Sequence, residues 1–88
     1  MNPTDVERVI EDALPNAHAR VTTPRPNDTD HLAAEVVSPA FEDRSLVDQH
    51  SLVYDAVDDH LTTDIHALKV TTYTPAEAPP DAPGQSGA

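Results

Sequence analysis

The spacing of the apolar residues alternates along this chain between a helical and a strand period, and the order of these changes restricts the possible folds most strongly. Residues 4–14 and 45–61 carry apolar side chains at helical spacing, which is typical of amphipathic helices. Residues 17–21, 31–38 and 65–74 show the alternation or the short apolar runs of strands. The order predicts an α+β fold, with helices packed on one face of a three-stranded sheet.

The connections between these segments predict a mixed sheet. The first two strands are joined by a loop, Thr22 to Asp30, so they can pair antiparallel. Pro39 ends the second strand because proline has no N–H for the ladder, and Phe41 to Arg44 forms a short irregular or single-turn segment. The third strand follows a helical crossover, which is compatible with parallel pairing.

Polar residues mark the starts of both predicted helices. Thr4 and Glu7 have the spacing of a capping box, and Ser45 can cap the second helix with support from Asp48. Pro15 ends the first helix. The predicted buried stripes are Val6, Val9, Ile10, Ala13 and Leu14 in the first helix, and Leu46, His50, Val53, Tyr54, Val57 and Leu61 in the second.

Length and composition limit the chain to one domain without thiol chemistry. Its 88 residues allow a single domain, which we place at residues 1–75. Residues 76–88 are rich in Ala, Pro, Gly and Ser without any period, so we predict a disordered tail. Because there is no cysteine, a metal must be bound through histidine or carboxylate. No phosphate loop or nucleophile motif is present, and we expect no enzyme.

The acidic charge restricts the partners that the chain can attract. Sixteen acidic residues face five basic ones, for a net charge of −11, and Lys69 is the only lysine. Such a domain repels phosphate backbones, which argues against simple nucleic-acid binding, although high salt would screen the repulsion. Many aspartates with almost no lysine are typical of proteins from salt-loving microbes such as halophilic archaea. A solvated acidic surface explains the charge better than an acidic recognition patch.

The sequence shows neither a signal peptide nor a membrane segment. No basic region followed by an apolar stretch stands at the N-terminus, and no apolar run approaches the roughly 20 residues of a membrane helix. We therefore expect a soluble, cytoplasmic chain with no membrane partner.

Of the five histidines, His66 has the position best suited to a metal ligand. It stands at the start of the third strand, in a pattern that places it on one face with Leu68 and Val70. Neutral imidazole is a good ligand for iron. Spacing alone favours the alternative, a packed histidine bonded to backbone. His50, on the apolar stripe of the second helix, has the same structural explanation.

Three stretches of this sequence, in this order, resemble the BolA family. The first is His31-Leu32 running into Val36-Val37-Ser38-Pro39-Ala40-Phe41, and the second is Ser45-Leu46-Val47-Asp48-Gln49-His50-Ser51-Leu52-Val53-Tyr54. The third is Ile65-His66-Ala67-Leu68 followed by Thr72-Tyr73-Thr74-Pro75. The resemblance covers residues 4–75 and implies a KH-like fold of type αββααβ.

The resemblance also implies a role and a partner. BolA proteins share a 2Fe–2S cluster with monothiol glutaredoxins, and the histidine at the position of His66 is their ligand. The cluster would exist only in the complex, with none in the isolated chain, which we expect to be a monomer or a weak homodimer. Other BolA proteins are DNA-binding transcriptional regulators, which is the alternative function.

Three departures from the family pattern concern the site. Glu42 and Asp43 follow Phe41, where the family often has glycine, and Gln49 stands where it often has arginine. Some relatives carry a second cluster ligand, His or Cys, in the loop between the first two strands. Here that loop has neither, and His31 at its end is the nearby candidate. The number of ligands that this chain supplies stays open.

Overall fold

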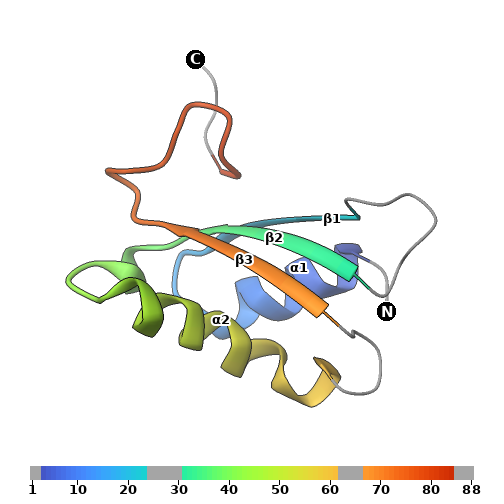
Figure 1. Ribbon diagram of the computed structural model, residues 1–88. Helices are drawn as coiled ribbons and strands as arrows, with labels where there is room; N and C mark the ends of the chain where they lie inside the picture. The colour runs from blue at the N-terminus through green and yellow to red at the C-terminus, as the bar shows by residue number, and fades with distance from the viewer. Residues whose placement is uncertain (1–2, 24–30, 62–66, 85–88) are drawn as a thin grey trace.

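The computed structural model describes residues 3–23, 31–61 and 67–84 (Figure 1). Its elements are α1 (Pro3–Ala13), β1 (His18–Thr22), β2 (His31–Val37), the short 3-10 helix η1 (Pro39–Phe41), α2 (Leu46–Leu61) and β3 (Ala67–Tyr73). This order confirms the predicted α+β, αββααβ arrangement, with η1 as the short helix before α2. None of the helices in these ranges is long and apolar enough to cross a bilayer.

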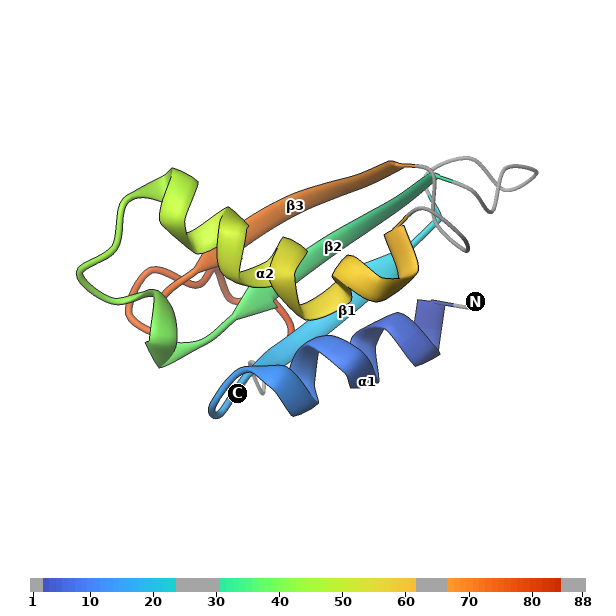
Figure 2. The same cartoon turned by 90° about the horizontal axis from the view of Figure 1, so that it is seen from below.

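The three strands form a mixed sheet with β2 at its centre. β1 pairs with β2 antiparallel, and β3 pairs with β2 parallel, as the loop and the helical crossover predict. Both helices cover the same face of the sheet (Figures 1 and 2). We call the opposite side the open face. It carries His18, Arg20, Thr22, His31, Ala33, Glu35, Val37, Lys69, Thr71 and Tyr73.

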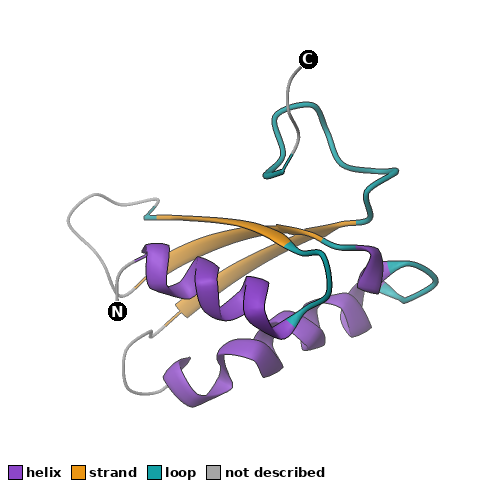
Figure 3. Ribbon diagram, turned by 180° about the vertical axis from the view of Figure 1, so that it is seen from behind, coloured by secondary structure: helices purple, strands orange, loops and turns teal. Residues whose placement is uncertain are grey.

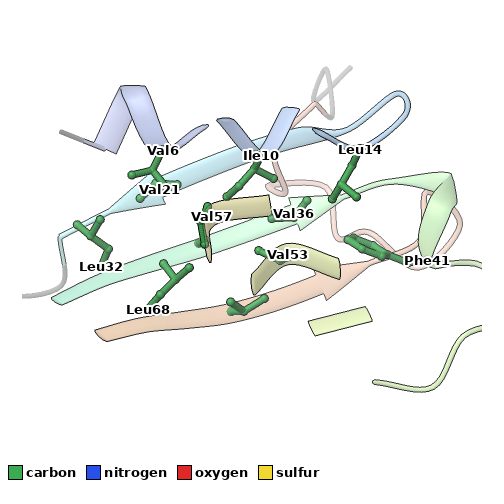
Figure 4. Close-up of a cluster of buried hydrophobic side chains, with 13 residues drawn as sticks. Val6, Ile10, Leu14, Val21, Leu32, Val36, Phe41, Val53, Val57 and Leu68 are labelled. Atoms are coloured by element: carbon green, nitrogen blue, oxygen red, sulfur yellow. The ribbon is translucent and has the colours of Figure 1, made fainter. Parts of the chain in front are cut away.

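The core lies between the two helices and the sheet (Figure 4). Most of its side chains are valines and other small aliphatic residues, and Phe41 is the largest fully buried one. α1 contributes Val6 and Ile10 from its predicted stripe, and Leu14, which follows the helix directly, is also in the core. The apolar period of the sequence therefore locates the buried face of α1, apart from Ala13, which is exposed.

The predicted capping box at the start of α1 is wrong. The helix begins at Pro3, so Thr4 lies inside its first turn instead of capping it. The Glu7 carboxylate reaches across to the sheet, where Oε2 accepts a hydrogen bond from the N–H of Val21 at 2.8 Å. Glu11, one turn later, accepts from the N–H of Ala19 at 3.0 Å. Since β1 is an edge strand, these carboxylates occupy donors that no neighbouring strand uses.

The buried face of α2 also differs from its predicted stripe. Val53 and Val57 are buried as expected and His50 is half-buried, but Leu46 is 61% exposed and Tyr54 is 37% exposed. Leu46 lies in the first turn, where the helix has not yet reached the core. The Leu61 side chain lies outside the described residues. The predicted cap is confirmed, because Ser45 Oγ accepts a hydrogen bond from the N–H of Asp48 at 3.2 Å.

Residues 75–84 follow a defined path on the open face of the sheet, opposite the helices (Figure 3). A turn begins at once, with the N–H groups of Glu77 and Ala78 bonded to the carbonyl of Thr74. Ala82 is only 3% exposed. The predicted tail of residues 76–88 thus includes a segment with local structure, while its last four residues lie outside the described ranges. Its disorder in solution stays a prediction.

Replacing both Glu7 and Glu11 by alanine should destabilise the domain, because two N–H groups of β1 lose charged acceptors. We expect the free energy of unfolding to fall by about 2 kcal/mol, since hydrogen bonds to charged groups contribute about 1.5–3 kcal/mol each when well shielded and less when exposed. Urea denaturation followed by circular dichroism measures the change. Asp12→Ala, an exposed position on the same helix, is the control for lost charge. A double variant as stable as this control would contradict the assignment.

Candidate functional site

One end of the sheet carries the predicted ligand His31 and the residue that follows the other predicted ligand in the sequence. β2 starts at His31 and β3 starts at Ala67, and these two residues are register partners in the parallel pair. His31 is exposed on the open face. His66 directly precedes Ala67 in the sequence, but it lies outside the described residues, so its assignment as a ligand stays a prediction. The two residues that it was predicted to share a face with, Leu68 and Val70, are both buried toward the helices.

Two other histidines, His18 and His50, lie apart from this end. His18, on β1, is in register with Val37 at the opposite end of the sheet, and His50 is half-buried on α2. Within the described ranges, no three His, Cys, Asp or Glu side chains gather closely enough to hold a metal ion. This part of the chain therefore offers at most a fraction of a ligand set, not a complete metal centre.

A tyrosine of α2 holds the beginning of β3. Tyr54 donates a hydrogen bond from its hydroxyl to the carbonyl oxygen of Leu68 at 2.9 Å. Leu68 is the second residue of β3, two positions after His66. The hydrogen bond and the parallel ladder both fix the strand next to the candidate ligand. By its spacing in the sequence Tyr54 belongs to the predicted apolar stripe, and the spacing gives no sign of this polar contact.

A glutamine of α2 holds the other end of β3 and the turn before α2. Gln49 Nε2 donates to the carbonyl oxygens of Phe41 at 3.2 Å and Arg44 at 2.9 Å. Its Oε1 accepts a hydrogen bond of 2.7 Å from Thr72 Oγ1, which is buried. Gln49 therefore connects the turn, the helix and the strand. In the sequence Gln49 stands out only as a departure from a family pattern. No motif or spacing near it predicts these three contacts.

The turn between η1 and α2 has aspartate at a backbone conformation that glycine adopts most easily. Asp43 has φ 62°, in the left-handed region that glycine adopts most easily. Aspartate is one of the few other residues that tolerate this region. The presence of Glu42 and Asp43 after Phe41 is thus compatible with the backbone course of this turn.

Comparison with known proteins decides the family. The sequence model for the family described as BolA-like protein matches residues 1–77. The chain belongs to the BolA family. This match spans the described helices and strands, so the resemblance first seen in three stretches extends over the whole sheet and both helices.

Individual BolA proteins resemble the chain in sequence and in fold. Protein BOLA1, chloroplastic, from Arabidopsis thaliana is 39% identical over 75 residues, which are 84% of this chain but only 47% of that protein. The solved bolA homologue from Coxiella burnetii is 37% identical with a TM-score of 0.69, covering 86% of this chain and 94% of that one. The BolA domain of SufE1 from Arabidopsis thaliana is 32% identical with a TM-score of 0.73, with the same two coverages. The chain thus spans about half the length of BOLA1, and what that whole protein does is not carried over.

Gln49→Leu should lower the stability of this BolA domain more than an ordinary exposed substitution. The change leaves two carbonyl oxygens and the buried Thr72 hydroxyl without their partner, so we expect a loss of about 2 kcal/mol in the free energy of unfolding. Urea denaturation measures it. Ser51→Ala, an exposed position on the same helix, is the control and should change stability by less than about 0.5 kcal/mol. Equal effects of the two substitutions would show that the Gln49 contacts are unimportant.

Proposed function

We propose that this BolA domain is a non-enzymatic adaptor in iron–sulfur cluster assembly or trafficking, with His66 as its ligand to a 2Fe–2S cluster shared with a monothiol glutaredoxin-type partner. The observation that carries the proposal is the β2–β3 register. Ala67, which follows His66 directly, lies beside the exposed His31 at one end of the sheet. Family membership supports the same role.

The ligand chemistry of the chain suits a shared cluster. The sequence has no cysteine, so the thiolates that iron–sulfur clusters require must come from the partner and a bound low-molecular-weight thiol. An imidazole in place of one thiolate raises the reduction potential of such a cluster and makes the ligand sensitive to protonation.

The chain's own contribution is a rigid support for that ligand. The strand after His66 is held by the parallel ladder to β2 and by the Tyr54 hydroxyl. Because the strand that follows the ligand is already held, binding the metal would order little of the chain after it. His31 is the candidate for a second ligand from this chain.

Anaerobic reconstitution tests the ligand assignment. The chain is mixed with a monothiol glutaredoxin, glutathione, iron and sulfide, and visible absorption and circular dichroism are recorded. We expect the wild-type mixture to give a spectrum different from that of the glutaredoxin alone. His66→Ala should return the spectrum to that of the glutaredoxin alone, because the imidazole ligand is lost.

Two matched variants complete this experiment. His18→Ala removes an exposed histidine at the far end of the sheet and should leave the mixed spectrum unchanged. His31→Ala should alter the spectrum only if His31 is a second ligand. A wild-type spectrum from His66→Ala would refute the assignment.

The alternative function, a DNA-binding transcriptional regulator, has weaker support. The basic residues in the described ranges, Arg8, Arg20, Arg44 and Lys69, belong to separate segments of the chain and do not line one element. Arg20 is already paired with Glu35. A gel-shift titration should therefore show no sequence-selective DNA binding by the isolated chain. The cytoplasmic location and the halophilic source remain predictions from the sequence.

A further inference from the structure

The C-terminal segment covers one end of the open face. Val37 belongs to the open face by its position in β2. Side chains alternate between the two faces of a strand, and Val36, one residue earlier, lies in the core under the helices. Val37 is nevertheless only 2% exposed, and it is not a member of the core cluster under the helices. Something on the open side must therefore bury it. Residues 75–84, which we call the strap, lie on that side (Figures 1 and 3).

Two residues of the strap, Ala82 and Gly84, have burial and packing that agree with this placement. Ala82 is 3% exposed although it lies in a polar, turn-rich segment outside the core cluster. Gly84 has φ +80°, and a Cβ added there would lie 2.2 Å from Cγ of His18. Because His18, Val37 and Tyr73 form one row across the sheet, Gly84 lies over the row that contains Val37. A side chain at residue 84 would meet both a steric clash and an unfavourable backbone conformation.

Hydrogen bonds within the strap define its own turns, and one of its charges acts on an arginine of the open face. The strap starts with the Thr74 hydroxyl bonded to Glu77 at 2.8 Å and continues with the N–H of Ala82 bonded to the carbonyl of Pro79 at 3.0 Å. The hydrogen bond that Arg20 donates to Glu35 raises the pKa of Arg20, and the charges of Glu35 and Asp81 add to this effect.

We propose that residues 75–84 act as an intramolecular strap that closes the Val37 end of the open face and is latched by the close packing of Gly84 against His18. The strap leaves the opposite end, where His31 and Ala67 lie, uncovered. A partner that binds at that end need not displace the strap, whereas a partner for the Val37 end must first displace it. This inference does not depend on the iron–sulfur proposal.

Thiol labelling tests the strap directly, because the natural chain has no cysteine and each introduced thiol is the sole target. Three single variants of β2 are compared: Val37→Cys under the strap, Ala33→Cys on the uncovered part of the open face, and Ala34→Cys in the core under the helices. Reaction with a maleimide is followed by mass spectrometry under native conditions. We expect the thiol at residue 37 to react at least about tenfold more slowly than the one at residue 33.

The latch is tested by adding Gly84→Val to each labelling variant. The added side chain should release the strap and raise the labelling rate at residue 37 about tenfold, with no change at residues 33 and 34. Ala82→Asp, which places a charge in the buried contact, should have the same selective effect. Equal labelling rates at residues 37 and 33 in the chain that keeps Gly84 and Ala82 would overturn the proposal. So would a rate at residue 37 that neither substitution changes, or an equal rise at residue 34, which would mean that the whole domain opens.

Discussion

The central strand β2 is the constraint on which the rest of the structure depends, since both other strands are bonded to it. Its register is fixed by burial. Leu32, Ala34 and Val36 face the helices, and a slip of one residue would turn this apolar set to the open face. The parallel pairing with β3 then fixes His31 beside Ala67 at one end and Val37 beside Tyr73 at the other. The position of His31 and that of the Val37 row under the strap are thus set by the same ladder.

Polar side chains of the helices connect to the backbone of the two outer strands. On β1, Glu7 and Glu11 accept hydrogen bonds from N–H groups that face no strand. On β3, the Tyr54 hydroxyl bonds the carbonyl of Leu68. An exposed strand edge invites pairing with another chain, and occupying its groups with side chains reduces this hazard. Part of the acidity of this chain therefore has a structural use, beyond giving it a solvated surface.

The two ends of the open face have different characters. At one end His31 is exposed beside Ala67, which directly follows in sequence the residue that the family resemblance marks as a ligand. The end with Val37 is closed by residues of the same chain. Between them, Arg20 and Glu35 form a salt bridge of 2.8 Å across neighbouring strands. Under the proposed function, a metal-bearing partner would bind at the His31 end while the strap keeps the Val37 end closed.

The sequence by itself determined the order of the elements, the mixed sheet, the buried stripe of α1 and the Ser45 cap, because each depends on periodicity or on neighbours within one turn. It also selected His66, through resemblance to a family. Only the tertiary structure decided that Glu7 bonds β1 instead of capping α1, that Leu46 is exposed, and that Val37 lies under the strap. Each of these outcomes depends on segments that are far apart in the sequence and meet only after folding. A period shows which face of an element is apolar, but it does not show what will cover that face.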